Sequence, residues 1–171
     1  MSANIKTFGL GVFNKSPNVE YKVYENGLYL GNSTLSEHLL LVEIIDKEQT
    51  TFKLHPDTRT IAEFACYKSN MTEVTSWGNN LKTIGYGAFM QSKLTAITLP
   101  NSLETIADSA FKQTKLTSLN FGTGLKAICY EAFSNCPDLA DVTLPNSLER
   151  IDSSFFMALA LPTLITKTDD I

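Results

Sequence analysis

The chain has 171 residues, with 14 basic and 18 acidic side chains, a net charge of −4 and a hydrophobic content of 43%. This apolar content is enough to build a core, which excludes a wholly disordered chain. No run approaches the ~18–20 apolar residues that span a bilayer, so the sequence predicts no membrane helix. The slight acidic excess disfavours contact with a phosphate backbone, so nucleic acid is not an expected partner.

Residues 1–18 weakly repeat a spacing that becomes regular further along the chain. Their apolar positions are Ile5, Phe8, Val12 and Phe13. We therefore expect a first partial coil over this segment. The opening residues lack the continuous apolar stretch of a secretory leader, so this chain predicts no signal peptide.

Residues 19–49 have a different character and are expected to form a β insertion. Tyr21 and Val23 alternate with polar residues, and the following Asn26-Gly27 pair is a strong signal for a two-residue turn. The apolar run over residues 38–45 predicts a further strand. Because the apolar side chains lie on one side of the predicted hairpin, we expect the insertion to dock against its neighbours.

Residues 50–80 are a divergent copy, and residues 81–166 the regular copies, of one repeat. Regular copies begin at Leu81, Leu103, Leu125 and Leu148, which are 22, 22 and 23 residues apart. An aromatic column runs through them at Phe89, Phe111, Phe133 and Phe156, and Cys66 takes this place in the divergent copy. A unit this short cannot enclose a core, so successive copies must stack and bury their columns against one another.

Each repeat divides into a strand and a turn. Residues 94–100 alternate apolar and polar side chains, as a half-buried strand does, and Pro100 ends the pairing because it has no N–H. The spacing of Ile84, Ala88 and Phe89 favours a short helical or 3₁₀ turn. We predict one solenoid domain of about five to six coils over residues 1–171, α/β or mostly β, with parallel strands on one face and a short tail over 167–171.

The unit L-x-x-I-x-x-x-A-F-x-x-x-x-L-x-x-I-x-L-P resembles the BspA-like leucine-rich repeat. The segment from Tyr24 to Gly31 also resembles one that is common between repeats of that family, and the likeness extends over roughly residues 5–165. The resemblance implies a leucine-rich-repeat solenoid. It also implies a cell-surface or secreted binding module, here part of a longer protein, of the kind found in bacteria that live on a host and proposed to adhere to host proteins.

The expected ligand-binding surface is the outward side of the strands, because side chains alternate between the two faces of a strand. The residues expected there are Glu73, Thr75, Ala96, Thr98, Ser118, Asn120, Asp141 and Thr143, followed by Thr163 and Ile165. Two interpretations remain open. The first is a solvated sheet rich in β-favouring threonine, and the second is a modest, wet contact surface for a protein or glycan ligand.

The sequence predicts no catalysis, no cofactor and no metal site. His38 and His55 are its two histidines, and neither a G-x-S-x-G elbow nor a zinc-type spacing of Cys and His accompanies them. Cys66 and Cys136 are expected to be small buried hydrophobes rather than redox groups, whereas the exposure of Cys129 stays open.

A structural role is the alternative to ligand binding. The chain opens inside a coil and stops soon after its last repeat, and solenoid ends need polar caps. In this alternative the protein is a scaffold subunit of a larger assembly, cytoplasmic or in a virion. Its partners would be contacted through the terminal coils, which could also self-associate.

Overall fold

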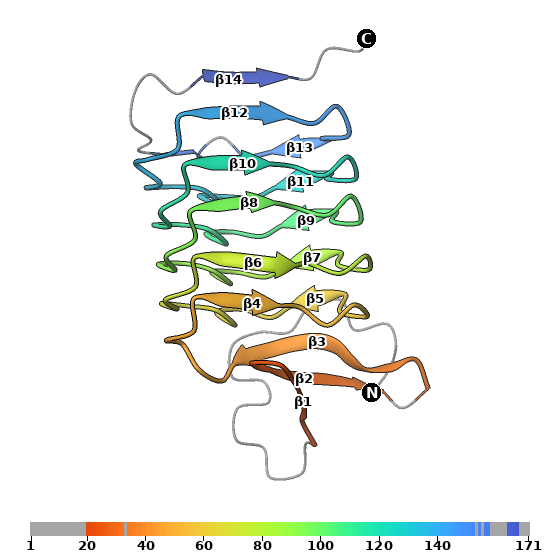
Figure 1. The fold of residues 1–171 in the computed structure, drawn as a ribbon. Coiled ribbons are helices and arrows are strands. Elements are labelled where there is room, and N and C mark those ends of the chain that lie inside the picture. Colours follow the sequence, from red (N-terminus) through yellow and green to blue (C-terminus); the bar gives the residue numbers. More distant parts are fainter. Residues whose placement is uncertain (1–19, 33, 153, 155, 158–163, 168–171) are drawn as a thin grey trace.

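A computed structural model describes residues 20–32, 34–152, 154, 156–157 and 164–167. In this part of the chain, stacked coils carry short strands on two opposite faces (Figure 1). The first, called here the strand face, carries β4 (Thr51–Lys53), β6 (Glu73–Ser76), β8 (Ala96–Thr98), β10 (Ser118–Asn120), β12 (Asp141–Leu144) and β14 (Leu164–Lys167). The second, called the opposite face, carries β5 (Thr60–Ile61), β7 (Thr83–Ile84), β9 (Thr105–Ile106), β11 (Ala127–Ile128) and β13 (Arg150–Ile151).

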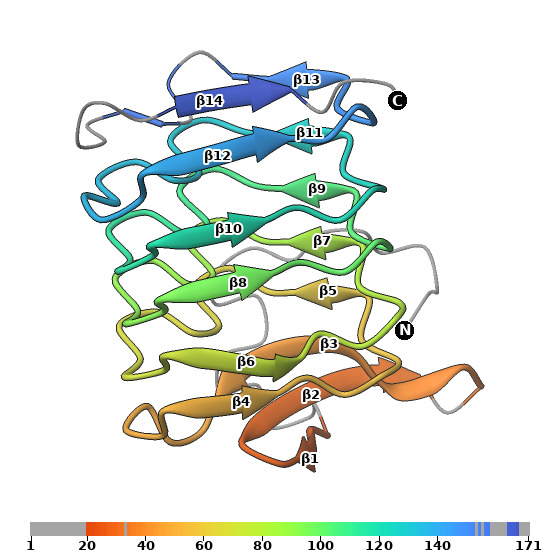
Figure 2. The same cartoon turned by 45° about the horizontal axis from the view of Figure 1, so that its top comes forward.

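Paired strands of the same face are parallel, and those of the opposite face stay in register from coil to coil. On the opposite face, Thr83 pairs with Thr105, and Thr105 with Ala127, so equivalent positions of successive repeats are direct neighbours. The strand face is built from three paired ribbons, β4–β6, β8–β10 and β12–β14. Figure 2 shows that the strands of the two faces point in opposite directions, because the chain turns back within every coil. The predicted parallel-strand solenoid is therefore confirmed.

The turn that follows each strand of the opposite face is not helical, so the expected helical or 3₁₀ turn is wrong. The structure has no helix in the described residues. Each turn has two residues, four apart, with φ between 53° and 60°: Phe64 and Lys68, Gly87 and Gln91, Ser109 and Gln113, Glu131 and Asn135. Left-handed residues cannot continue a right-handed helix.

Backbone hydrogen bonds between coils take the place of helical ones in these turns. The N–H groups of Gly87, Phe89 and Gln91 donate to carbonyls of the next coil at 2.8–3.0 Å. The intervening N–H groups of Ala88 and Met90 donate three residues back within their own turn. Every second amide therefore links two coils, and the turns stack as regularly as the strands do.

The core is a set of columns that run along the stack. Phe89, Phe111 and Phe133 are fully buried, and their rings stack with centroids 5.2 Å apart and interplanar angles of 3° and 4°. The Leu and Ile columns are equally buried, with at most 1% exposure at Leu81, Leu103, Leu125, Ile84, Ile106 and Ile128. Identical side chains at one-coil spacing thus bury one another, as the repeat requires.

An antiparallel meander closes the N-terminal side of the described coils. Its strands are β1 (Lys22–Tyr24), β2 (Gly27–Asn32) and β3 (Ser36–Ile44), and β3 then pairs in parallel with β5. The meander extends the opposite face into an eight-stranded sheet within the described residues. The expected first partial coil over residues 1–18 lies outside those residues, and the proposed segment boundaries stay predictions.

Candidate functional site

Eight of the predicted ligand-binding residues occupy four successive strands of the strand face. Exposed side chains among them are Glu73 and Thr75 on β6, Ala96 and Thr98 on β8, Ser118 and Asn120 on β10, and Thr143 on β12. Asp141 begins β12, and Ile165 lies in β14. Thr163 falls outside the described residues. The strands present the exposed residues outward because the alternate side chains, such as Ile97, fill the core.

Six of these residues line one shallow groove across β6, β8 and β10, with a volume of about 650 Å³. The apolar part of its lining comes from Val74, Ile97, Leu119 and Trp77. Trp77 is only 7% exposed, because its ring packs edge-on against Phe89 at 5.5 Å. Apolar side chains therefore form the base of the groove, and polar side chains form its exposed surface.

A second depression of about 680 Å³ adjoins the groove at Leu119 and Asn120. It runs past Thr143 on β12 to the loop that contains Pro145 and Asn146. The two depressions together extend across β6, β8, β10 and β12, along the direction in which the coils stack. A long, shallow surface of this kind suits an extended ligand that crosses several coils.

Side chains in the groove differ in whether their hydrogen-bonding groups are already used. The hydroxyl of Thr75 donates to the carbonyl of Phe52 at 3.1 Å. Within the described residues, the side chains of Thr98, Ser118 and Asn120 form no hydrogen bond. Thr98 pairs with Asn120 across β8 and β10, so their side chains stand about 4.8 Å apart in the pairing direction.

The groove holds one charged group among its lining residues, the exposed carboxylate of Glu73. Its other polar groups are hydroxyls and the Asn120 amide. Such a surface can donate and accept neutral hydrogen bonds, and it has little charge with which to attract a strongly ionic ligand. These properties favour a neutral polar ligand, or a polar stretch of a protein.

A cluster that sequence reasoning missed lies on the opposite face. Ligand atoms of Asp108, Cys129 and Asp152, from three successive coils, lie within 4.8 Å of one another. The Arg150 guanidinium donates to Cys129 Sγ at 3.5 Å and to Asp152 Oδ2 at 3.2 Å. Arg150 thus already supplies the positive charge that this acidic cluster requires.

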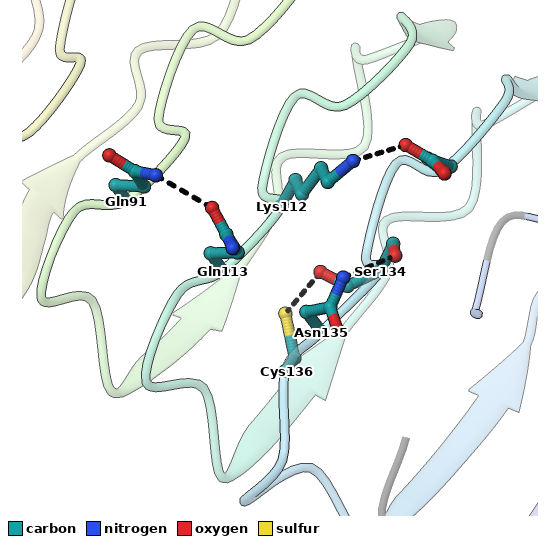
Figure 3. A network of polar contacts seen from close by, with 7 residues as sticks. Gln91, Lys112, Gln113, Ser134, Asn135 and Cys136 are labelled. Atoms are coloured by element: carbon teal, nitrogen blue, oxygen red, sulfur yellow. Dashed lines mark hydrogen bonds and ion pairs between the residues drawn. The ribbon is translucent and has the colours of Figure 1, made fainter. Parts of the chain in front are cut away.

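The turns that follow the strands of the opposite face form a further surface, called here the turn edge, on which polar side chains bond from coil to coil (Figure 3). Gln91 donates to the Gln113 side chain at 2.7 Å one coil away. Lys112 bonds the Glu131 carboxylate across the next step. These groups bond to one another rather than facing an open depression, so the turn edge stabilises the stack and is a weaker candidate for ligand binding.

The three cysteines are free thiols. Cys66 and Cys136 are fully buried, and burial raises the pKa of both thiols. Burial also raises the pKa of the half-buried Cys129 thiol. A raised pKa keeps each thiol protonated and weakly nucleophilic at neutral pH.

Stacked coils of 22–23 residues, bound by leucine, isoleucine and phenylalanine columns, define a leucine-rich-repeat β-solenoid. A family model described as "BspA type Leucine rich repeat region" matches six copies over residues 59–169. The chain therefore belongs to the BspA-type leucine-rich-repeat family. No curated protein matches the chain significantly.

Solved structures of bacterial leucine-rich-repeat proteins share the fold. A leucine-rich-repeat protein of T. pallidum is 25% identical, with a TM-score of 0.65, over 83% of this chain and 65% of that one. The pneumococcal vaccine antigen PcpA is 22% identical, with a TM-score of 0.66, over 91% of this chain and 38% of that one. A Bacteroides capillosus protein is 19% identical, with a TM-score of 0.53, over 87% and 99%.

The chain spans less than two thirds of the length of the first two proteins. The described part of the chain also holds no helix that is long and apolar enough to cross a membrane.

Proposed function

We propose that the protein is a non-catalytic binding module that holds a protein or glycan ligand on its strand face. The observation that carries the proposal is the groove across β6, β8 and β10, where Thr98, Ser118 and Asn120 offer polar groups that have no hydrogen-bond partner among the described residues. A ligand that forms hydrogen bonds with these groups would take the place of their hydrogen bonds to water, and it would extend across two coils. The interface is then polar and wet, and its affinity comes from several aligned contacts.

The family supports a setting for this activity. The chain consists largely of BspA-type repeats, and one similar structure is a pneumococcal vaccine antigen. We propose that this chain acts at the cell surface or outside the cell, as a segment of a longer adhesin-like protein. Recognition rather than chemistry suits the strand face, because the lining residues include one carboxylate and no histidine or cysteine to pair with it.

Two arrays would test the proposal, one of printed oligosaccharides and one of purified extracellular-matrix proteins. The strand-face variant carries Thr98→Arg, Asn120→Arg and Thr143→Arg. It should lose at least about 30-fold in affinity for any probe that the wild-type chain captures, which corresponds to the ~2 kcal/mol of a binding hot spot. The bulky side chains fill the groove, and they add charge to a surface that has little.

A matched control adds the same three positive charges to the opposite face, through Thr83→Arg, Thr105→Arg and Ala127→Arg. These residues are in-register neighbours on β7, β9 and β11, so the control also places its three charges on three successive coils. The control should bind within about twofold of wild type, provided both variants keep the wild-type circular dichroism spectrum. Unchanged capture by a folded strand-face variant would refute the proposal.

A further inference from the structure

Two imidazole rings stack face to face where the meander meets the first described coil. The His38 ring, from β3, lies 4.0 Å from the His55 ring, from the loop after β4, with an interplanar angle of 11°. Two tyrosines close around the pair. Tyr24 of β1 meets His55 edge-on at 4.7 Å, and Tyr29 of β2 meets His38 at 5.4 Å. The cluster therefore joins β1, β2 and β3 to the coil that carries β4.

Hydrogen bonds at this junction require a neutral His55. The backbone N–H of Asp57 donates to His55 Nδ1 at 3.2 Å, so this nitrogen must be an unprotonated acceptor. Protonation would place an N–H against the N–H of Asp57 and break the bond. The backbone N–H of His55 also donates to the Tyr29 hydroxyl at 3.3 Å, which ties the same loop to β2.

The surroundings of His55 oppose its protonation. Burial lowers the pKa of His55, the adjacent His38 lowers it further, and the carboxylate of Asp57 acts in the opposite sense. Burial raises the pKa of Tyr29, so this phenol stays neutral in the same pH range. Tyr29 thus contributes no anion, and the carboxylate of Asp57 is the nearby group that favours a proton on His55.

The direction of the pH effect follows from this shift. The folded-state pKa of His55 lies below its ordinary value of 6.5. Its contribution to docking is therefore complete above about pH 6.5 and is lost as the pH falls through the folded-state value.

We propose that the His38–His55 stack is an acid-sensitive latch, which helps to hold the β1–β3 meander on the solenoid at neutral pH and favours its opening when His55 becomes protonated. The meander is also held by the pairing of β3 with β5 at Leu40–Thr60 and Leu41–Ile61, and by the buried side chains of Tyr29, Leu41 and Ile44, so the stack contributes one part of its attachment. Release exposes the edge of β5 and the apolar residues beneath, while the coils beyond keep their own stacking.

The accessibility of the Cys66 thiol can be used to detect opening of the latch. Cys66 is fully buried next to the meander, and the N–H of Ile44 at the end of β3 donates to the carbonyl of the neighbouring Ala65 at 3.0 Å. Cys136 is also fully buried, but it lies three coils away between Thr114 and Phe111. Opening of the meander should therefore expose Cys66 and leave Cys136 protected.

The test measures labelling of both thiols with 4,4′-dithiodipyridine, read by peptide mass spectrometry, from pH 7.5 to 5.0. Each rate is divided by that of the urea-unfolded chain at the same pH, which removes the chemistry of the reagent. The relative rate at Cys66 should rise at least about tenfold below pH 6.5, while that at Cys136 stays constant. The variant His55→Phe keeps two stacked rings and removes the titrating group, so it should abolish the rise. The variant His38→Phe also keeps two rings and removes the neighbour that lowers the pKa of His55, so it should reduce the rise.

Three results would each overturn the proposal. One is equal protection of Cys66 at pH 7.5 and pH 5.0, and another is a rise shared by Cys136, which would indicate global unfolding. The third is a rise at Cys66 that persists unchanged in the histidine variants. If one variant fails to fold, the other still decides between these outcomes.

Discussion

Replacing Phe111 with alanine should cost about 4–5 kcal/mol of unfolding free energy. The ring is fully buried and lies 5.2 Å from both Phe89 and Phe133 in parallel stacks. A buried Phe→Ala change costs about 3–5 kcal/mol through lost burial and a cavity. We expect the upper part of that range, because two aromatic pairs are lost at once and each contributes about 0.5–1.5 kcal/mol beyond burial.

Urea unfolding followed by far-ultraviolet circular dichroism would measure this loss, with Phe111→Leu as the matched control. Leucine keeps most of the apolar volume, so it should cost only about 1–2 kcal/mol. The alanine variant should also unfold less cooperatively, because a weakened coil uncouples its neighbours on both sides. A loss below about 1 kcal/mol for alanine, or equal losses for the two variants, would refute a continuous aromatic column.

Two further changes test other parts of the stack. A methyl group at Gly122 would lie 2.4 Å from the carbonyl oxygen of Pro100, so Gly122→Ala should destabilise the fold by roughly 1–3 kcal/mol in thermal unfolding. Glu104 lies between Lys82 at 2.7 Å and Lys126 at 3.6 Å, and the hydrogen bond from Lys82 lowers the pKa of the Glu104 carboxyl. Glu104→Gln should therefore cost about 0.2–1 kcal/mol above pH 4.5, and this cost should disappear as the pH falls through the lowered value or in 1 M salt; a loss that persists at pH 3 would contradict the ion-pair account.

The sequence predicted the strands and the core well, because both depend on local alternation and on a fixed period. The alternation over residues 94–100 contains β8, Ala96–Thr98, and the phenylalanine column is the stack that the structure shows. The outward side of the strand face followed from the same alternation. The depth of the groove could not be predicted in this way, because it depends on how Trp77 and Leu119 pack beneath it.

The turns were mispredicted because their left-handed positions carry few glycines. Gly87 is a glycine at such a position, but Ser109 and Glu131 occupy the equivalent sites with φ of 55° and 53°. Apolar spacing alone cannot distinguish a helical turn from a turn whose amides bond the next coil. The cluster around Cys129 could have been found, because Asp152 lies in the same column of the repeat and Asp108 beside it.

The histidine stack could not be predicted from the sequence. His38 and His55 belong to different segments, and their contact depends on the way the meander docks. A lone histidine near a strand end carries no signal for a partner 17 residues away. Contacts between an insertion and a repeat array lie outside the periodic pattern that fixes the rest of the fold.

Mapping of amide chemical shifts by NMR during titration with the strongest array probe tests the central claim most directly. Ligand binding on the strand face predicts that the largest shifts occur at Thr98, Ser118 and Asn120. The in-register neighbours Thr83 and Thr105 on the opposite face should move little. Shifts centred on the opposite face, or on the turn edge, would contradict the account.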